Sequence, residues 1–292
     1  MNRDLRLPAL RRFAIAITAL NILGHTVFGF EQAWVHLFVG VLTAYAAEFL
    51  FEMLSAWSQH RTPRYRNGVI DFLLSPHITG CAVSMLLYPG GRIMPIVFAV
   101  LVAIASKTLF RAPMNGGTRH FLNPSNFGIT VTLVVFPWVV IAPPYHFTEN
   151  LWGWVDWLLP AIIIVSGSFL NTKFTKRMPL VAGWLLGFAT QAIVRTTLMD
   201  TATLSALLPM TGVAFILFTF YMITDPATTP DAPRAQFVFG AAVAAIYGVL
   251  VAWHIVFGLF FALTIVTALR GVLMLVASVA RRSAPDAARV PV

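Results

Sequence analysis

Two short polar stretches in a mostly apolar chain carry residues that can bind a ligand. The first reads N-G-G-T-R-H-F-L-N-P-S-N-F-G-I and covers residues 115–129. Asn123 before Pro124 is typical of a helix start, with Asn as the N-cap and Pro at the first helical position. The free N–H groups of such a start, flanked by Arg119, His120, Asn123 and Asn126, can hold a polar or anionic group. Ordinary capping by Asn123 is the competing interpretation.

Gly116 and Gly117 begin the same stretch and allow a close approach of the backbone near membrane depth. Irregular backbone is tolerated there only where protein or a cavity surrounds it. The second stretch, F-Y-M-I-T-D-P-A-T-T-P at residues 220–230, is predicted to break a helix. Its Asp225 can cap the next element, coordinate a cation or accept a hydrogen bond from a ligand N–H. The sequence leaves these three roles open.

Three carboxylates lie in or beside apolar runs, where a charged group costs about 2.5–3.5 kcal/mol on insertion scales. Glu48 and Glu52 are four residues apart, so they share one face of a helix. Asp71 opens the next apolar run. All three are candidates for an ion pathway. The competing interpretation of Glu48 is a partner for a Lys or Arg of a neighbouring span.

Other kinds of chemistry have little support in this sequence. The single cysteine, Cys81, cannot form a disulfide within the chain, and without a C-x-x-C pair iron–sulfur and haem c sites are excluded. Two facing histidines can hold haem b, but spacing defines no such pair. No metal site is predicted. The motifs of soluble hydrolases, metalloproteases and nucleotide-binding enzymes are missing, so no catalytic residue is predicted.

The elements that must position these residues are membrane spans. The chain has 292 residues, of which 58% are hydrophobic and 11% are charged, whereas a soluble domain has about 25% charged residues. One span takes roughly 17–25 apolar residues, and ten runs qualify, some of them short. They lie near residues 13–29, 33–55, 69–88, 93–110, 125–142, 152–170, 179–196, 205–223, 235–253 and 255–279. The last two are separated by a break at His254, with one long kinked helix as the alternative.

The distribution of Lys and Arg predicts the orientation of these spans. With ten spans, seventeen basic residues fall in the tails and loops of one side, and only Arg92 and Arg195 fall on the other. Both termini are therefore predicted to be cytoplasmic, with short basic tails at 1–12 and 281–292. The net charge of +9 is thus a topology signal, and no nucleic-acid partner is expected.

The predicted fold class is an all-α polytopic membrane protein of about ten transmembrane helices, forming one domain over residues 1–292. Non-spanning pieces of about a dozen residues are too short for an independent soluble core. Tryptophans near the predicted outer ends of spans form the expected aromatic belt at the bilayer surface. They are Trp34, Trp138, Trp152, Trp154 and Trp157.

The two polar stretches, in this order, resemble those of the D subunit of Rnf electron-transport complexes and the B subunit of the Na+-translocating quinone reductase (RnfD and NqrB). The resemblance rests on Lys107, on G-G-x-x-x-F-x-N-P from Gly116 to Pro124, and on M-I-T-D-P from Met222 to Pro226. A glutamate on the second span, a basic loop and Asp71 also fit, so it covers roughly residues 40–255. The continuation F-P-W-V-V-I-A-P-P-Y-x-F-T-E-N looks more specifically like the stand-alone RnfD-like proteins named UnbU, which are encoded with enediyne biosynthesis genes and more widely in bacteria.

The resemblance implies a ten-helix flavoprotein of the bacterial inner membrane that exchanges electrons with a protein partner, with ion movement or biosynthesis as the coupled process. In the complexes, the threonine of an S-G-A-T motif carries a covalent FMN. This chain has no S-G-A-T, and its nearest string is Ser166-Gly167-Ser168-Phe169. The covalent FMN is therefore expected to be missing.

A second, non-covalent flavin (riboflavin or FMN) is implied near the cytoplasmic face, beside Asn123 and Asn126, with Gly116 and Gly117 allowing close approach. The N-P-S-N here differs from the usual N-P-A-M of the complexes. The resemblance also implies that the fifth and eighth spans are neighbours, so that Asn123, Asn126 and Asp225 line one pocket. The alternative is a cofactor-free transporter or small-molecule-binding protein on the same scaffold.

Overall fold

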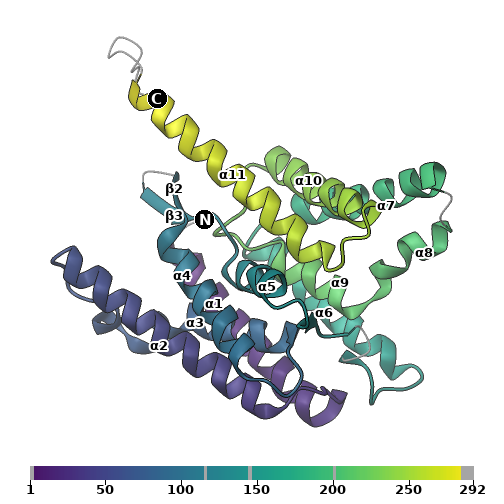
Figure 1. Cartoon of the computed structure of the whole chain (residues 1–292), viewed down its shortest axis with the longest axis horizontal. Helices are drawn as coiled ribbons and strands as arrows, with labels where there is room; N and C mark the ends of the chain where they lie inside the picture. The colour runs from purple at the N-terminus through teal and green to yellow at the C-terminus, as the bar shows by residue number, and fades with distance from the viewer. Residues whose placement is uncertain (1–2, 115–116, 144–146, 200–201, 284–292) are drawn as a thin grey trace.

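The structure is a computed structural model that describes residues 3–114, 117–143, 147–199 and 202–283. Within these ranges, seven helical segments are long and apolar enough to cross a membrane. The first is α1 (Arg3–Leu23), which continues as the π-helix η1 (Gly24–Phe28). The others are α2 (Trp34–Ser58), α3 (Val69–Leu86), α6 (Val155–Lys173), α7 (Met178–Met199), α10 (Pro233–Ala252) and α11 (Gly258–Ser283). The chain is therefore a multi-pass helical membrane protein (Figure 1).

The three remaining predicted runs are helical but broken or short. Two pieces, α8 (Thr203–Leu207) with η4 (Leu208–Thr211) and α9 (Val213–Leu217) with η5 (Phe218–Met222), meet at Gly212 with a bend of 64° and qualify together as an eighth span. The helices α4 (Met94–Leu109) and α5 (Pro124–Val135) are apolar but have only 16 and 12 residues. At 1.5 Å per residue, α5 is about 18 Å long, less than a hydrocarbon core of about 30 Å.

The predicted helical run 125–142 is too long by seven residues. The α5 helix ends at Val135, because Pro137 lacks the N–H that a continuing helix needs. Instead, β4 (Val140–Ile141) pairs antiparallel with β1 (Leu87–Tyr88), which is also where the predicted run 69–88 leaves its helix. A short strand pair thus connects two loops on one side of the molecule.

Two other predicted boundaries have clear outcomes. The break at His254 is confirmed: α10 ends at Ala252, His254 has a positive φ of 58°, and α11 begins at Gly258. A single kinked helix is therefore wrong. Within the predicted tail 1–12, the chain is already helical from Arg3, and the candidate span begins at Leu7. In the C-terminal tail, the helix continues to Ser283, and residues 284–292 lie outside the described part of the chain.

The connections gather at two opposite ends, and the basic ones share one end. There, Arg11 pairs with Asp71 at 2.7 Å, and the Arg12 guanidinium stacks 4.5 Å from the Phe174 ring. At the other end, Arg92 lies 4.3 Å from the Trp138 ring. The grouping confirms that the basic loops lie together, as the charge distribution predicted. We refer to these as the inner and the outer end.

Glycines allow the closest helix contacts. A Cβ on Gly240 of α10 would lie 2.3 Å from the Leu180 carbonyl oxygen of α7, and a Cβ on Gly183 would lie 2.1 Å from the Phe237 carbonyl oxygen. Small residues of this kind let the backbones of two helices approach each other closely. Such packing matters in a membrane, because the hydrophobic effect does not drive helices together in lipid. The α7–α10 pair is accordingly the most extensively packed pair of helices (Figure 1).

The helices form two halves with similar pairings. In the first half, α4 packs on α2 and α5, and α1 packs on α3; in the second, α10 packs on α7 and α11, and α6 packs on α9 and η5. The two halves meet where α5 packs on α11 near the middle of the molecule (Figure 1). The short α5 thus lies within protein, which explains how so short an apolar helix is accommodated.

Candidate functional site

A cavity of about 1520 Å³ lies between the two halves and is lined from both. One wall comes from α1 to α4, and the other from α6, η5 and the turn that follows η5. The hairpin of β2 (Arg111–Met114) and β3 (Gly117–His120) adds to the inner end. Toward the outer end the lining is apolar and includes Leu20, Leu23, Met85 and Leu159. The cavity therefore has a polar inner end and an apolar remainder.

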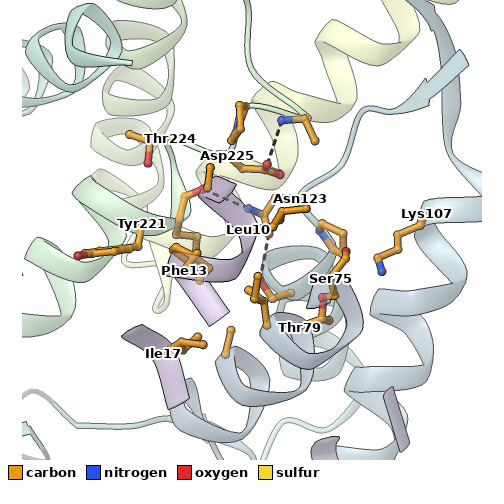
Figure 2. A pocket seen from close by; sticks show the side chains of 18 of the residues that line it. Leu10, Phe13, Ile17, Ser75, Thr79, Lys107, Asn123, Tyr221, Thr224 and Asp225 are labelled. Atoms are coloured by element: carbon orange, nitrogen blue, oxygen red, sulfur yellow. Dashed lines mark hydrogen bonds between the residues drawn. The ribbon is translucent and has the colours of Figure 1, made fainter. Parts of the chain in front are cut away.

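Asn123 joins the two polar stretches that the sequence singled out. Its Oδ1 accepts from the Asn126 backbone N–H at 3.1 Å, which makes it the N-cap of α5. Its Nδ2 donates to the carbonyl oxygen of Met222 at 3.1 Å (Figure 2). Asn123 thus caps one helix and ties it to the end of η5, 99 residues later. The structure places the start of α5 beside the T-D-P turn at the cavity wall.

Asp225 lines the cavity and also caps its own turn. One carboxylate oxygen accepts from the Ala227 backbone N–H at 2.9 Å (Figure 2). The other accepts from the Thr228 hydroxyl at 3.1 Å. Thr224 donates to the Phe220 carbonyl at 2.7 Å within the same turn. The sequence left three roles open for Asp225. These contacts correspond to capping.

Asn126 does not line the cavity, so the expectation that it joins Asn123 and Asp225 in one pocket is corrected. Its Nδ2 donates to the Phe260 carbonyl at 3.0 Å and to the Thr264 hydroxyl at 2.8 Å, both on α11. The reason is helical geometry: Asn126 is in the first turn of α5 on the face that packs against α11.

The glycine and arginine candidates lie on the hairpin. Gly117 and Arg119 line the cavity, and Gly116 lies outside the described residues. The half-buried Arg119 side chain has no hydrogen-bond or ion-pair partner within the described part of the chain. The neighbouring Arg111 donates to the Thr118 carbonyl at 2.7 Å and to the Lys107 carbonyl at 3.2 Å, which holds the hairpin against the end of α4.

Glu48 forms a largely buried ion pair with Lys107 of α4 in the cavity wall. The Lys107 Nζ lies 2.9 Å from the carboxylate, and the two side chains are 11% and 12% exposed. Arg64 lies 3.7 Å from the other Glu48 oxygen. The interpretation of Glu48 as a partner for a basic residue of a neighbouring span therefore fits the structure.

Glu52 and Asp71 also line the cavity with basic partners. The buried Glu52 carboxylate accepts from Arg61 at 2.5 Å and from Arg64 at 2.7 Å. The hydrogen bond that Arg61 donates to Glu52 raises the pKa of the Arg61 guanidinium. Asp71 accepts a bidentate pair of bonds from Arg11 of α1, from Nε at 3.0 Å and from Nη2 at 2.9 Å. These pairs join α1, α2, α3 and the loop after α2 at the inner end.

The structure adds lining residues that the sequence did not single out. The Phe13 ring of α1 lies 5.4 Å from the Tyr221 ring, and the Tyr221 hydroxyl lies 2.7 Å from the Ser166 hydroxyl. Ser75 and Thr79 of α3 face the same space (Figure 2). In Figure 2, Tyr221 and Lys107 lie on opposite sides of the region drawn, with Asn123 between them. Tyr221 directly precedes the M-I-T-D-P stretch, so its position in the sequence could have marked it as a lining residue. Phe13 lies in an evenly apolar run, and nothing in the sequence distinguishes it from its neighbours.

The S-G-S-F string has a packing role. A Cβ on Gly167 would lie 2.5 Å from the Cβ of Phe220, so the glycine lets α6 cross η5 closely. The string lies within α6, and its exposed Ser166 lines the cavity with its hydroxyl 2.7 Å from that of Tyr221.

His120 lines the cavity, and a second histidine, His77 of α3, is engaged within the protein. His77 Nδ1 lies 2.8 Å from the Tyr45 hydroxyl, and Nε2 lies 2.7 Å from the Thr18 hydroxyl. Thr18 donates to the Ala14 carbonyl, so it accepts from Nε2–H, and Nδ1 accepts from Tyr45. Both nitrogens are thus occupied. Within the described residues, no group of three His, Cys, Asp or Glu side chains could hold a metal ion.

A scan of the chain against protein-family models found no match, and a search of the curated proteins found none either.

Proposed function

We propose that the chain is an integral membrane electron-transfer protein that holds a non-covalent flavin, riboflavin or FMN, at the inner end of the cavity and exchanges electrons with a protein partner. The observation that carries the proposal is the contact between Asn123 and Met222. It brings the N-P and T-D-P stretches, on which the resemblance to RnfD, NqrB and UnbU rests, to one cavity wall.

The lining has the groups that a flavin needs. Phe13 and Tyr221 offer aromatic faces to a flat ring system. The Ser75 hydroxyl has no partner among the described residues, so it is available to the carbonyl and N–H groups at the edge of such a ring. Ligand pockets usually measure about 300–1,000 Å³, so a cavity of about 1520 Å³ has room for a flavin.

The chemistry divides between the cofactor and the chain. A bound flavin supplies the ability to take up and release electrons, which no side chain of the cavity does on its own. The chain would orient the flavin ring against Phe13 and Tyr221, whose own rings are in contact, and exclude water with the apolar part of the lining. The buried ion pair of Glu48 and Lys107 places one negative and one positive charge at fixed positions in the cavity wall.

We also propose that all ten apolar segments together cross the bilayer of a bacterial inner membrane, with α4, α5 and the bent pair completing spans inside the protein. The gathering of basic connections at the inner end supports an even number of crossings with both termini cytoplasmic.

The absorption spectrum of the purified protein tests the cofactor. We expect the visible bands of an oxidised flavin, and we expect acid or denaturant to release the chromophore completely. Asp225→Asn and Ser75→Val should lower flavin content, whereas Asn126→Ala, which does not line the cavity, should not. A folded, monodisperse protein without flavin bands would overturn the proposal, and a Soret band would point to haem instead. Fluorescence that stays with the denatured chain would show covalent attachment.

A cofactor-free transporter or small-molecule-binding protein is the second candidate. The observation that favours it is the length of the cavity, which runs from Arg61 and Asp71 at the inner end to Leu23 and Leu159 near the outer end. Packing similarity between two halves on either side of a central cavity is also common in secondary transporters. A colourless but folded protein would favour this candidate.

A further inference from the structure

The inner end of the cavity carries more positive than negative charge. Five basic side chains and four carboxylates line it: Arg61, Arg64, Lys107, Arg111 and Arg119 against Glu48, Glu52, Asp71 and Asp225. Asp71 is also paired with Arg11 of α1, which does not line the cavity. Three of these carboxylates are held directly by the basic side chains, at 2.5 to 2.9 Å.

The hairpin adds two positive charges that no carboxylate of the described residues compensates. Arg111 donates to neutral oxygens only, those of Thr118 and Lys107. Arg119 has no hydrogen-bond or ion-pair partner among the described side chains and lines the cavity while half-buried. The Arg119 guanidinium has no nitrogen that is both buried and unpaired, so it keeps contact with solvent and is open to an incoming anion.

Ordinary topology does not explain Arg119. A positive-inside signal needs only exposed basic residues, such as Arg66 in the loop after α2. Arg119 instead lies on a hairpin that packs on α4 and α11, and its side chain faces the cavity. The planar guanidinium is the protein group best suited to bind a phosphate through two parallel hydrogen bonds.

We propose that the ligand of this cavity carries a phosphomonoester that Arg119 binds at the inner end. This inference rests on the proposed flavin function and deepens it. It names FMN rather than riboflavin as the cofactor, because only FMN carries a phosphate. Arg111 contributes positive charge and holds the hairpin in place. The flat part of the ligand lies deeper, against the rings of Phe13 and Tyr221, and the charged end stays at the inner end.

Titration of the full-length purified protein with riboflavin and with FMN tests the inference. We expect FMN to bind about 10- to 100-fold more tightly, since a hydrogen bond to a charged group contributes that much. Arg119→Gln should bring the FMN affinity to within about threefold of the riboflavin affinity and leave riboflavin binding unchanged. Arg66→Gln, the matched control on an exposed loop, should leave both affinities unchanged. Equal affinities in the unsubstituted protein, or an unchanged ratio in Arg119→Gln, would overturn the inference and leave the flavin function standing.

Inorganic phosphate separates this inference from the proposed function. Phosphate should raise the thermal midpoint of the unsubstituted protein relative to sodium chloride of equal ionic strength, and it should have no such effect on Arg119→Gln. Stabilisation by phosphate without any flavin binding would support the anion site and reject the flavin. Phosphate stabilisation that persists in Arg119→Gln would reject Arg119 as the anion ligand.

Lipid headgroups are the other source of phosphate chemistry. In nanodiscs of phosphatidylcholine, the effect of inorganic phosphate should persist, and nanodiscs of phosphatidylglycerol should preserve it too. Loss of the effect in phosphatidylglycerol alone would show that a lipid headgroup occupies the site, and it would overturn the soluble-ligand form of the proposal.

Discussion

Single polar residues around the cavity divide into those that hold helices together and those whose groups remain free. Asn123 uses its oxygen to cap α5 and its amide to bind the end of η5, so it has a structural role at the cavity wall. Ser75 and Arg119 line the same cavity without partners among the described residues. Ligand selectivity is therefore expected to depend on Ser75 and Arg119 more than on the asparagines.

Asn126→Ala tests this division. The substitution removes two hydrogen bonds to α11, from Nδ2 to the Phe260 carbonyl and to the Thr264 hydroxyl. Hydrogen bonds between membrane helices contribute on average about 0.6 kcal/mol each, so we expect a loss of about 1 kcal/mol and a lower thermal midpoint. Flavin content per protein should not change. Loss of flavin with an unchanged midpoint would instead place Asn126 in the binding site.

The buried pair of Glu48 and Lys107 allows a second test. Glu48→Gln leaves the Lys107 ammonium in the cavity wall without its carboxylate, and breaking a buried pair costs about 3–5 kcal/mol. Lys107→Met alone should be similarly harmful, because it leaves Glu48 with only the more distant Arg64. The double variant Glu48→Gln with Lys107→Met should be more stable than either single variant. Additive losses in the thermal unfolding of the three variants would show that the pair is not coupled.

Helix packing depends on a few glycines at crossing points and on helices that are shorter than a bilayer. The α7–α10 contact has glycines on both sides, Gly183 and Gly240, each against the backbone of the other helix. The α5 helix of 12 residues is held between α4 and α11 rather than in lipid. Because α5 is short, its capped N-terminus can lie at the cavity. An apolar helix long enough to cross the bilayer would instead have its N-terminus in the headgroup region.

Gly240→Ala tests the role of the close crossing. The added Cβ would meet the Leu180 carbonyl oxygen at 2.3 Å and the Trp184 backbone nitrogen at 2.6 Å. Since neither is the end of a flexible side chain, α7 and α10 must separate, at a cost of about 1–3 kcal/mol. Gly91→Ala is the control, because no atom lies within 4 Å of its added Cβ. Equal thermal midpoints for the two variants would contradict the packing.

The whole molecule is organised by its two ends and its two halves. Basic residues and their carboxylate partners gather at the inner end, whereas tryptophans gather at the outer end, where Trp152, Trp154 and Trp157 are strongly exposed. The cavity lies between the halves and has its charged residues at the inner end. A ligand with a polar and an apolar part would thus place its polar part at the inner end.

Reporter fusions test the orientation. Fusions after Arg61 and after Val292 should both report a cytoplasmic location, and a fusion after Glu149 should report an external one. The physical reason is the excess of Lys and Arg on one side, which resists translocation. Opposite locations for Arg61 and Val292 would contradict an even number of crossings. A Glu149 fusion on the same side as Arg61 would contradict the assignment of the two ends.

The sequence by itself determined the membrane class, the positions of the apolar helices, the side of the basic loops and the break at His254. These properties follow from local composition and from turn residues, which act over one helix length. It also singled out Asn123 as a cap, because Asn before Pro marks a helix start.

Only the tertiary structure decided which polar groups meet. The Asn123–Met222 bond joins residues 99 positions apart, and the Glu48–Lys107 pair joins residues 59 positions apart. Sequence spacing places two residues on one helix face, but it does not say which helix that face meets. Asn126 was assigned to the cavity for that reason and faces α11 instead, because the packing of α5 between α4 and α11 sets its rotation.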